Sequence, residues 1–451
     1  MFRNSPILIP ALPLLLLMAC ALHPPQARGF CGFYVAKADA SLYNKASRVV
    51  LVRHDRKTVI SMMNDYDGDL TEFALVVPVP VVLKKEQVHI GSRAVFDHID
   101  AYSAPRLVEY FDEDPCRVVT RALASSESSA RIDTKYQFKH RGAQNGVRVE
   151  EEYTVGEYDI VILSATESDG LERWLVANGY RIPKGASAAL QPYIRQDMRF
   201  FVAKVNLAEQ AKTGVTYLRP LQFAFESEKF MLPIRLGMIN ASGPQDLLLY
   251  VLTRDGRVET TNYATVKLPS GQELPPYIKP EFADFYRAMF DRQVERETMR
   301  AVFTEYFWDM GWCDPCAADP LSADELRGLG VFWLDESASD ERRGMSGSPV
   351  LITRLHVRYS RETFPEDLVL QETRDRENFQ GRYVLRRPWR GEAGACDAAR
   401  TYLQELPARQ EREAQALASL TGWEIDEIRA KIWPDGTPTA TTDPWWKQIW
   451  R

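Results

Sequence analysis

Two thiols that lie three residues apart carry the most recognisable chemistry in this sequence. The stretch from Trp312 to Cys316 reads WCDPC, so Cys313 and Cys316 flank an Asp-Pro pair. Cysteines at this spacing can form a redox-active dithiol, half of a zinc site, or two structural disulfide partners. Which of these chemistries is available depends on the elements that hold the motif.

The surroundings of the motif favour a structural role. Trp-Cys-x-Pro-Cys is similar to a thioredoxin active site, in which a strand precedes the motif and a helix starts at the first thiol and lowers its pKa. The aromatic spacing from Phe282 to Phe307 instead predicts a preceding helix, and Pro320 would interrupt a helix begun at Cys313. Asp314 would raise the pKa of both thiols by like-charge repulsion. We therefore expect a structural turn, with a redox pair Cys313 and Cys316 as the alternative.

The remaining cysteines decide how the motif could be paired. A zinc site needs a second pair of ligands, and the only downstream candidates, Cys396 and His356, do not form one. In an oxidising compartment thiols tend to join in disulfides. The disulfide candidates are Cys31, Cys116, Cys313, Cys316 and Cys396. Five choices of the unpaired thiol times three pairings give fifteen arrangements, and in several of them a motif thiol joins Cys396.

Residues 1–29 predict export. Arg3 precedes an almost wholly apolar stretch, Ile7 to Met18, which has the length of a signal-peptide core and is too short to span a bilayer. Ala27-Arg28-Gly29 predicts cleavage before Phe30. Leu17-Met18-Ala19-Cys20 reads instead as a lipobox that would leave Cys20 lipidated. We expect a periplasmic or extracellular protein, membrane-tethered as a lipoprotein if Cys20 carries the lipid.

Composition and periodicity predict an α+β fold. The chain has 451 residues and a formal charge of −6, which argues against a nucleic-acid partner because such partners select a basic face. Residues 30–265 are strand-rich, 266–395 hold a helix, the WCDPC segment and returning strands, and 396–433 read as C-terminal helices. We expect a strand-rich N-terminal part, with antiparallel or mixed sheets, and a helical C-terminal part.

Local signals within these segments predict two hairpins and an edge strand. Asp55-Arg56-Lys57 separates two β-branched runs, and Asp255-Gly256 separates another pair, so each is expected to close a hairpin. Pro78 and Pro80 cannot donate to a sheet ladder and predict the end or the edge of a strand. The arginine-rich stretch 382–390 predicts a charged edge strand.

The last segment, 434–451, is a Trp-rich tail. Trp445, Trp446 and Trp450 are costly to leave in water, so they are expected to dock on the body or to contact a membrane interface or a partner. A lipid on Cys20 is the other expected membrane contact. No cofactor loop or metal cluster is present in the sequence pattern, so we expect no cofactor and no metal site.

Several stretches taken in order resemble a known bacterial family. They are CGFYVAKADA, VVPVPVVL, SAPRLVEYFDEDPC, WCDPC before LGVFW, and NFQGRYVLRRPW. Together they resemble domain of unknown function 2330, from about Cys31 to Trp389 and into the terminal helices. The resemblance implies an exported bacterial protein and brings no reaction and no catalytic residues. We expect a non-enzymatic cell-envelope protein, stabilised by disulfides, that binds or scaffolds an unknown envelope partner or ligand. The alternative is an envelope thiol–disulfide oxidoreductase.

Overall fold

The computed structural model describes residues 33–36, 43–67, 73–117, 147–178, 180, 185–214, 217–239, 241, 243–312, 319–334 and 350–434. Its first long feature is an antiparallel hairpin of β2 (Tyr43–His54) and β3 (Lys57–Asp67), in which His54 faces Lys57. Asp55 takes a positive φ of 53°, the left-handed conformation that a two-residue hairpin turn needs. The hairpin expected at this point is confirmed.

This hairpin lies inside a mixed nine-stranded sheet. The strand order is β14-β16-β17-β12-β2-β3-β10-β5, with β19 paired to β16. β12 runs parallel to β2 and β14 parallel to β16, and the other neighbours are antiparallel. The other strands are β5 (Val88–Ile90), β10 (Leu221–Glu226), β12 (Gln245–Thr253), β14 (Ala264–Lys267), β16 (Ala301–Asp309), β17 (Leu351–Tyr359) and β19 (Phe379–Gln380).

A second, antiparallel sheet has the order β1-β4-β9-β8-β7. Its strands are β1 (Phe33–Ala36), β4 (Phe73–Val79), β7 (Arg148–Val155), β8 (Tyr158–Ser164) and β9 (Arg199–Val205). Side chains alternate between its faces. Phe201 points into the core shared with the nine-stranded sheet, whereas Phe200 packs with helices α2 (Ser168–Ala177) and α3 (Ala186–Arg195).

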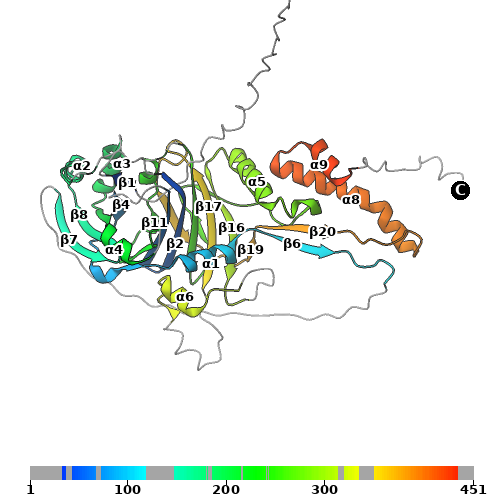
Figure 1. Cartoon of the computed structure of the whole chain (residues 1–451), viewed down its shortest axis with the longest axis horizontal. Helices are drawn as coiled ribbons and strands as arrows, with labels where there is room; N and C mark the ends of the chain where they lie inside the picture. Colours follow the sequence, from blue (N-terminus) through cyan, green and yellow to red (C-terminus); the bar gives the residue numbers. More distant parts are fainter. Residues whose placement is uncertain are drawn as a thin grey trace, which may run out of the picture.

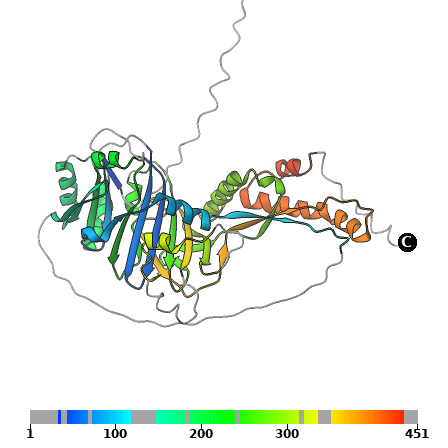
Figure 2. The ribbon, with the colours of Figure 1, turned by 60° about the horizontal axis from the view of Figure 1, so that its bottom comes forward.

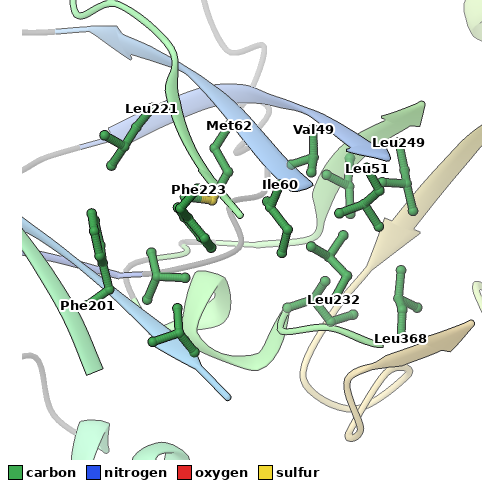
Figure 3. Close-up of a cluster of buried hydrophobic side chains, with 14 of the residues drawn as sticks. Val49, Leu51, Ile60, Met62, Phe201, Leu221, Phe223, Leu232, Leu249 and Leu368 are labelled. Carbon is green, nitrogen blue, oxygen red and sulfur yellow. The ribbon is translucent and has the colours of Figure 1, made fainter. Parts of the chain in front are cut away.

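The largest hydrophobic core lies between these two sheets. Leu51, Ile60 and Leu249 from the nine-stranded sheet point into the same space as Phe201 (Figure 3). A small sheet of β11 (Met231–Leu232), β18 (Leu368–Glu372) and β13 (Val258–Thr260) closes one side. Burial of one such aliphatic or aromatic side chain contributes about 1.5–3 kcal/mol, so this core fixes the two sheets relative to each other.

The other face of the nine-stranded sheet is covered by helices. α1 (Arg93–Ser103) and α6 (Ala323–Gly328) pack on one hydrophobic cluster, and α5 (Phe282–Arg296) packs on the next. The remaining short elements are α4 (Leu207–Lys212) and three 3₁₀ turns at Lys85–Gln87, Arg235–Met238 and Pro276–Ile278.

An elongated C-terminal arm extends from one end of the molecule (Figures 1 and 2). It consists of the parallel sheet β15-β20-β6 and helices α8 and α9, which pack with α5. Its elements are β6 (Arg106–Phe111), β15 (Gln272–Leu274), β20 (Arg382–Arg387), α8 (Asp397–Thr421) and α9 (Ile425–Ile432). Gly422 separates the two helices with a φ of 76°.

The expected α+β class is confirmed, including a strand-rich N-terminal part and helices at the C-terminus. Three local expectations were wrong. The helix before the motif ends at Arg296, and residues 301–309 form β16. Asp255-Gly256 closes no hairpin, because β12 and β13 belong to different sheets. β20 is the middle strand of its sheet rather than an edge.

Candidate functional site

A cleft opens where the two large sheets meet, and we call it the inter-sheet cleft. Its volume is about 280 Å³. Ile60 comes from β3, Phe225 from β10, Pro78 from β4 and Met231 from β11, and Met198 lies directly before β9. Residues from five strands or their ends therefore build one apolar wall. Methionine side chains adapt to different shapes, so this lining suits a ligand rather than a fixed packing partner.

The mouth of the cleft is charged. Arg56 lies in the β2–β3 turn, and Glu228 and Lys229 follow the end of β10. An Arg56 Nη1–Glu228 Oε1 ion pair of 2.8 Å spans the mouth. Lys229 Nζ donates to Oε1 of Gln196 at 2.7 Å. An apolar interior with a few polar groups at its rim is typical of small-molecule sites.

Asp367 holds one wall of the cleft in place. Its buried carboxylate accepts hydrogen bonds from the hydroxyl of Tyr193 at 2.6 Å and from the backbone N–H groups of Ile234 and Arg235 at 3.0 and 3.2 Å. Burial raises the pKa of Asp367, against the lowering effect of these hydrogen bonds and of Arg235. The chain that follows Met231 is thereby fixed to α3.

A smaller hollow of about 200 Å³ lies beside α3 and Arg235. It is lined by Pro192 of α3, Phe364, Arg235 and Arg361. Arg235 is already neutralised by Glu366 Oε2 at 2.5 Å and by Asp367. The inter-sheet cleft is larger and is therefore the stronger binding candidate.

A buried ionic network lies on the opposite face of the nine-stranded sheet. Glu305 of β16 is 0% exposed and accepts hydrogen bonds from Arg354 Nε at 2.5 Å and from the hydroxyl of Tyr286. Its Oε1 lies 2.7 Å from His356 Nδ1, and the His356 ring stacks on Phe290 at 3.7 Å. Burial alone would raise the pKa of Glu305, but the charges of Arg354 and His356 lower it to about 2.

This network continues to α1 and α5 and ties both helices to the sheet. Arg354 Nη1 donates to Asp100 Oδ1 at 2.6 Å, and Tyr250 donates to the same oxygen at 2.7 Å. Arg358 forms a bidentate pair with Asp246 at 2.7 and 2.9 Å. A carboxylate, an imidazole and a phenol in contact could perform acid–base chemistry, but a substrate cannot reach a fully buried Glu305. We assign the network a structural role.

A family described as an uncharacterized protein conserved in bacteria (DUF2330) matches residues 25–371. The chain belongs to the DUF2330 family. The match covers the five-stranded sheet, every strand of the nine-stranded sheet except β19, and the inter-sheet cleft. It ends within β18, before β20 and α8. No curated protein and no solved structure matches the chain.

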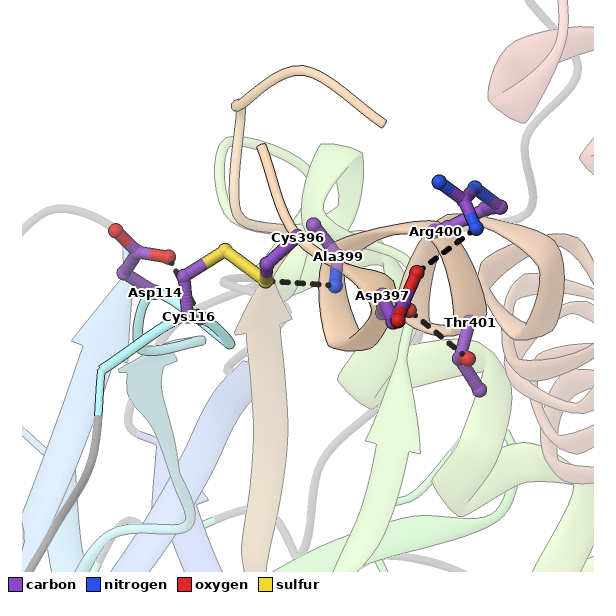
Figure 4. The surroundings of a disulfide bond; sticks show 7 residues. All are labelled: Asp114, Cys116, Cys396, Asp397, Ala399, Arg400 and Thr401. Atoms are coloured by element: carbon purple, nitrogen blue, oxygen red, sulfur yellow. Dashed lines mark hydrogen bonds and ion pairs between the residues drawn. A yellow bond between two sulfur atoms is a disulfide. The ribbon is translucent and has the colours of Figure 1, made fainter. Parts of the chain in front are cut away.

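One disulfide joins two of the candidate cysteines of this DUF2330 chain. Cys116, just after β6, is bonded to Cys396, with a Cα–Cα distance of 6.0 Å (Figure 4). Cys396 is also the N-cap of α8, where its Sγ accepts from the N–H of Ala399 at 3.4 Å. The bond fastens the start of α8 to the tip of the parallel sheet. The pairing of Cys396 with a motif thiol is therefore wrong, because its sulfur is already bonded to Cys116.

The Trp-Cys motif lies mostly outside the described residues, which include Trp312 but neither Cys313 nor Cys316. Trp312 is 66% exposed. The segment before it is β16, so a strand and not a helix leads into the motif. One of the arguments against a redox site is thereby removed. The argument from Pro320 is not tested, because residues 313–318 lie outside the described part of the chain.

The other residues expected to form sites lie outside the part of the chain that the structure describes. Cys20, Cys31 and the tail residues Trp445, Trp446 and Trp450 lie outside the described residues. In the described part of the chain, no helix is long and apolar enough to cross a membrane. No group of His, Cys, Asp or Glu in that part could hold a metal ion.

Two arginines of β20 form ion pairs with the neighbouring strands of the same sheet. Arg386 pairs with Glu273 at 2.9 Å, and Arg387 with Glu109 at 2.6 Å. They join β20 to its two neighbouring strands, which accounts for a basic stretch in the middle of a sheet.

Sequence reasoning missed the inter-sheet cleft and the buried network. The cleft has no local signal because its lining comes from separate segments. The network does have a local signal in the sequence. Arg354, His356 and Arg358 alternate along an apolar strand, so their side chains must share one face of the sheet.

Proposed function

We propose that this DUF2330 protein is an exported, non-enzymatic binding protein of the bacterial cell envelope, with the inter-sheet cleft as its binding site. The observation that carries the proposal is an apolar cleft of about 280 Å³ with a charged mouth, held between two sheets that share one core. Such a site is largely pre-formed, so binding costs little ordering of the protein.

Export is supported by the N-terminal segment and by the Cys116–Cys396 bond, because disulfides persist in oxidising compartments. Mass spectrometry of the protein recovered from cell fractions tests this half of the proposal. We expect a mature N-terminus at Phe30, or a lipid on Cys20, in the envelope or periplasmic fraction. An intact Met1 in the cytoplasmic fraction would overturn it.

The binding half is tested by filling the cleft. Met198→Trp and Val81→Trp each place an indole in it from a different wall. We expect small apolar and amphiphilic probes, followed by ligand-observed NMR, to bind the parent protein and to lose binding to both variants. Thermal unfolding confirms that each variant is folded. Probes that bind the parent and both variants equally would show that this cleft is not the site.

A second candidate is a thiol–disulfide oxidoreductase that uses Cys313 and Cys316. The finding that favours it is β16, which leads into the motif as a strand. A disulfide map of the unreduced protein separates the two candidates. A bond between Cys313 and Cys316 that opens at about −200 mV or above would support the oxidoreductase, since catalytic disulfides are more oxidising than structural ones. Bonds from these thiols to distant cysteines would exclude it.

A further inference from the structure

We propose that the inter-sheet cleft binds a small apolar carboxylate, with the hydrocarbon part in the cleft and the carboxylate at the mouth beside Lys229. This inference rests on the proposed binding function and adds the chemical class of the ligand. The apolar interior of the cleft, the polar groups at its mouth and a buried arginine behind the mouth all favour such a ligand.

The interior of the cleft selects an apolar group. Ile60, Met198 and Phe225 are buried in its walls, and Pro78 and Pro233 have no backbone N–H to offer a ligand. A polar group placed here would lose its water without gaining a partner, which costs about 1–3 kcal/mol on protein scales. A hydrocarbon chain or ring gains free energy from the same burial.

The acid at the end of β10 is directed away from the cleft. Glu226 lies opposite Lys57 in the β3–β10 ladder, one position after Phe225. Successive side chains of a strand point to opposite faces, and Phe225 lines the cleft. Glu226 therefore shares the other face of the sheet with Lys57, whose ammonium lies over the ring of Phe332 in the cluster beneath α1 and α6. It does not add a negative charge to the cleft.

Lys229 brings a positive charge to the mouth. Its Nζ donates to Oε1 of Gln196 at 2.7 Å, so it reaches from the end of β10 to the turn before β9. Among the described residues this ammonium meets no carboxylate, and its other N–H groups remain for a ligand. The hydroxyl of Ser227 accepts the N–H of Lys229 at 3.2 Å and keeps its own proton to donate. Arg56 and Glu228 neutralise each other through their ion pair of 2.8 Å.

A buried arginine lies directly behind the mouth. Arg53 is 6% exposed, and its guanidinium donates to the carbonyl oxygens of Arg56 at 3.2 Å and Ser227 at 3.0 Å. It also donates to the hydroxyl of Thr58 at 2.6 Å. All three acceptors are neutral, and no carboxylate of the described residues forms an ion pair with this guanidinium. Arginine stays protonated, so its charge, one hydrogen bond from two lining residues, makes the mouth attractive to an anion.

These groups distinguish between classes of apolar ligand. A carboxylate can accept from Lys229 and Ser227 and is attracted by the charge of Arg53. An alkylammonium would meet the like charges of Lys229 and Arg53, and the one acid it finds, Glu228, is already held by Arg56. An alcohol gains a hydrogen bond at the mouth without the ionic attraction. The mouth therefore ranks a carboxylate before an alcohol and an alcohol before an ammonium.

The volume sets the size of the ligand. Clefts for drug-sized molecules start at roughly 300 Å³, so about 280 Å³ suits a ligand at the small end of that range. Octanoate, 1-octanol and octylammonium are matched probes of this size, because they share one chain length and differ in the head group.

Isothermal titration calorimetry of the full mature protein with these three probes tests the proposal. We expect octanoate to bind at least about tenfold more tightly than 1-octanol and octylammonium, because a hydrogen bond to a charged group is stronger than a neutral one. Lys229→Met should weaken octanoate by about tenfold and leave 1-octanol unchanged. Lys229→Arg keeps the positive charge and should retain octanoate binding.

The control variant is Lys212→Met, which removes an exposed lysine on α4 that pairs with Glu209 and does not line the cleft. It should bind octanoate as the parent does. If Lys229→Met leaves octanoate unchanged, or Lys212→Met weakens it equally, the carboxylate inference fails. If 1-octanol binds as tightly as octanoate and Met198→Trp abolishes both, the inference fails and the binding function stands. If no probe responds to Met198→Trp, the inference and the assignment of this cleft fail together.

Discussion

Glu413 offers a quantitative test of the C-terminal arm. This carboxyl group of α8 is 3% exposed, and its Oε1 lies 3.4 Å from Arg409 Nε. Arg409 is shared, because its Nη1 also donates to Asp112 at 2.7 Å. Burial raises the pKa of Glu413 to about 7, with Glu273 and Asp112 adding to the effect and Arg409 opposing it. The folded arm therefore binds a proton that the unfolded chain releases near pH 4.5.

The sign and size of the effect follow from proton linkage. A carboxyl whose pKa is raised in the fold stabilises the protein fully below its unfolded pKa of 4.5, and this stabilisation is lost as the pH rises to about 7. At about 1.36 kcal/mol per pH unit, the loss is at most about 3 kcal/mol. Glu413→Gln is neutral at every pH, so it should gain up to about 3 kcal/mol relative to the parent between pH 4 and pH 8.

Urea unfolding of both proteins at pH 4 and pH 8 measures this difference, because all other titrating groups are shared and cancel. The matched control is Glu405→Gln, an exposed position on the same helix, which should shift the free energy of unfolding equally at both pH values. A difference between Glu413→Gln and the parent that does not change with pH would refute the reasoning. It would mean that the pKa of Glu413 is the same in the folded protein as in the unfolded chain.

Three further measurements address other parts of the fold. Replacing Cys116 and Cys396 with Ser should lower the free energy of unfolding by about 2–5 kcal/mol in urea without reductant, and unchanged midpoints would contradict a formed bond. Glu305→Gln leaves a buried guanidinium and an imidazole without their carboxylate, so a loss of about 3–5 kcal/mol is expected in the same assay; a loss under about 1 kcal/mol would contradict the pairing. The hydrogen bond of His98 to Glu325 raises the pKa of His98, so His98→Gln should cost about 0.5–1 kcal/mol near pH 5.5 and nothing near pH 9. An NMR titration that places the pKa of His98 at or below its ordinary 6.5 would refute that contact.

The sequence predicts elements whose signals are local. The turn at Asp55 was predictable because a short polar stretch separates two β-branched runs. Helix α6 was predictable from Ser322 and Glu325, which form a reciprocal capping box in the structure. In both cases the residues that specify the element are neighbours in the chain.

Residues 301–309 show where local reasoning fails. Val302, Phe303, Tyr306 and Phe307 follow a helical spacing by sequence, yet β16 is covered on both faces and is buried at nearly every position. A strand without a solvent face has no alternating pattern, so its apolar residues can match a helical period by chance. The hairpin predicted at Asp255-Gly256 is wrong for a different reason. β13 pairs with β18, which lies over a hundred residues later in the chain.

The candidate site was not predictable for a related reason. Arg56, Pro78, Met198 and Phe225 line one cleft because separate strands and a turn converge there, and none of these residues has an unusual neighbour in the sequence. Only the tertiary structure places them together. The cysteine list did contain the bonded pair, but the pairing depended on the parallel alignment of β6 with β20.

The Cys116–Cys396 bond also sets an order of events during synthesis. Its two cysteines are 280 residues apart, so Cys116 emerges long before its partner exists outside the ribosome. Strand β6 likewise waits for β20, its hydrogen-bonded neighbour, which is made almost as late. Both large sheets can assemble in that interval, except for the strands made last, whereas the arm can close only when the chain is nearly complete. Cys116 can meanwhile pair wrongly with Cys31, which precedes it in the chain, and a disulfide isomerase would correct that mispairing.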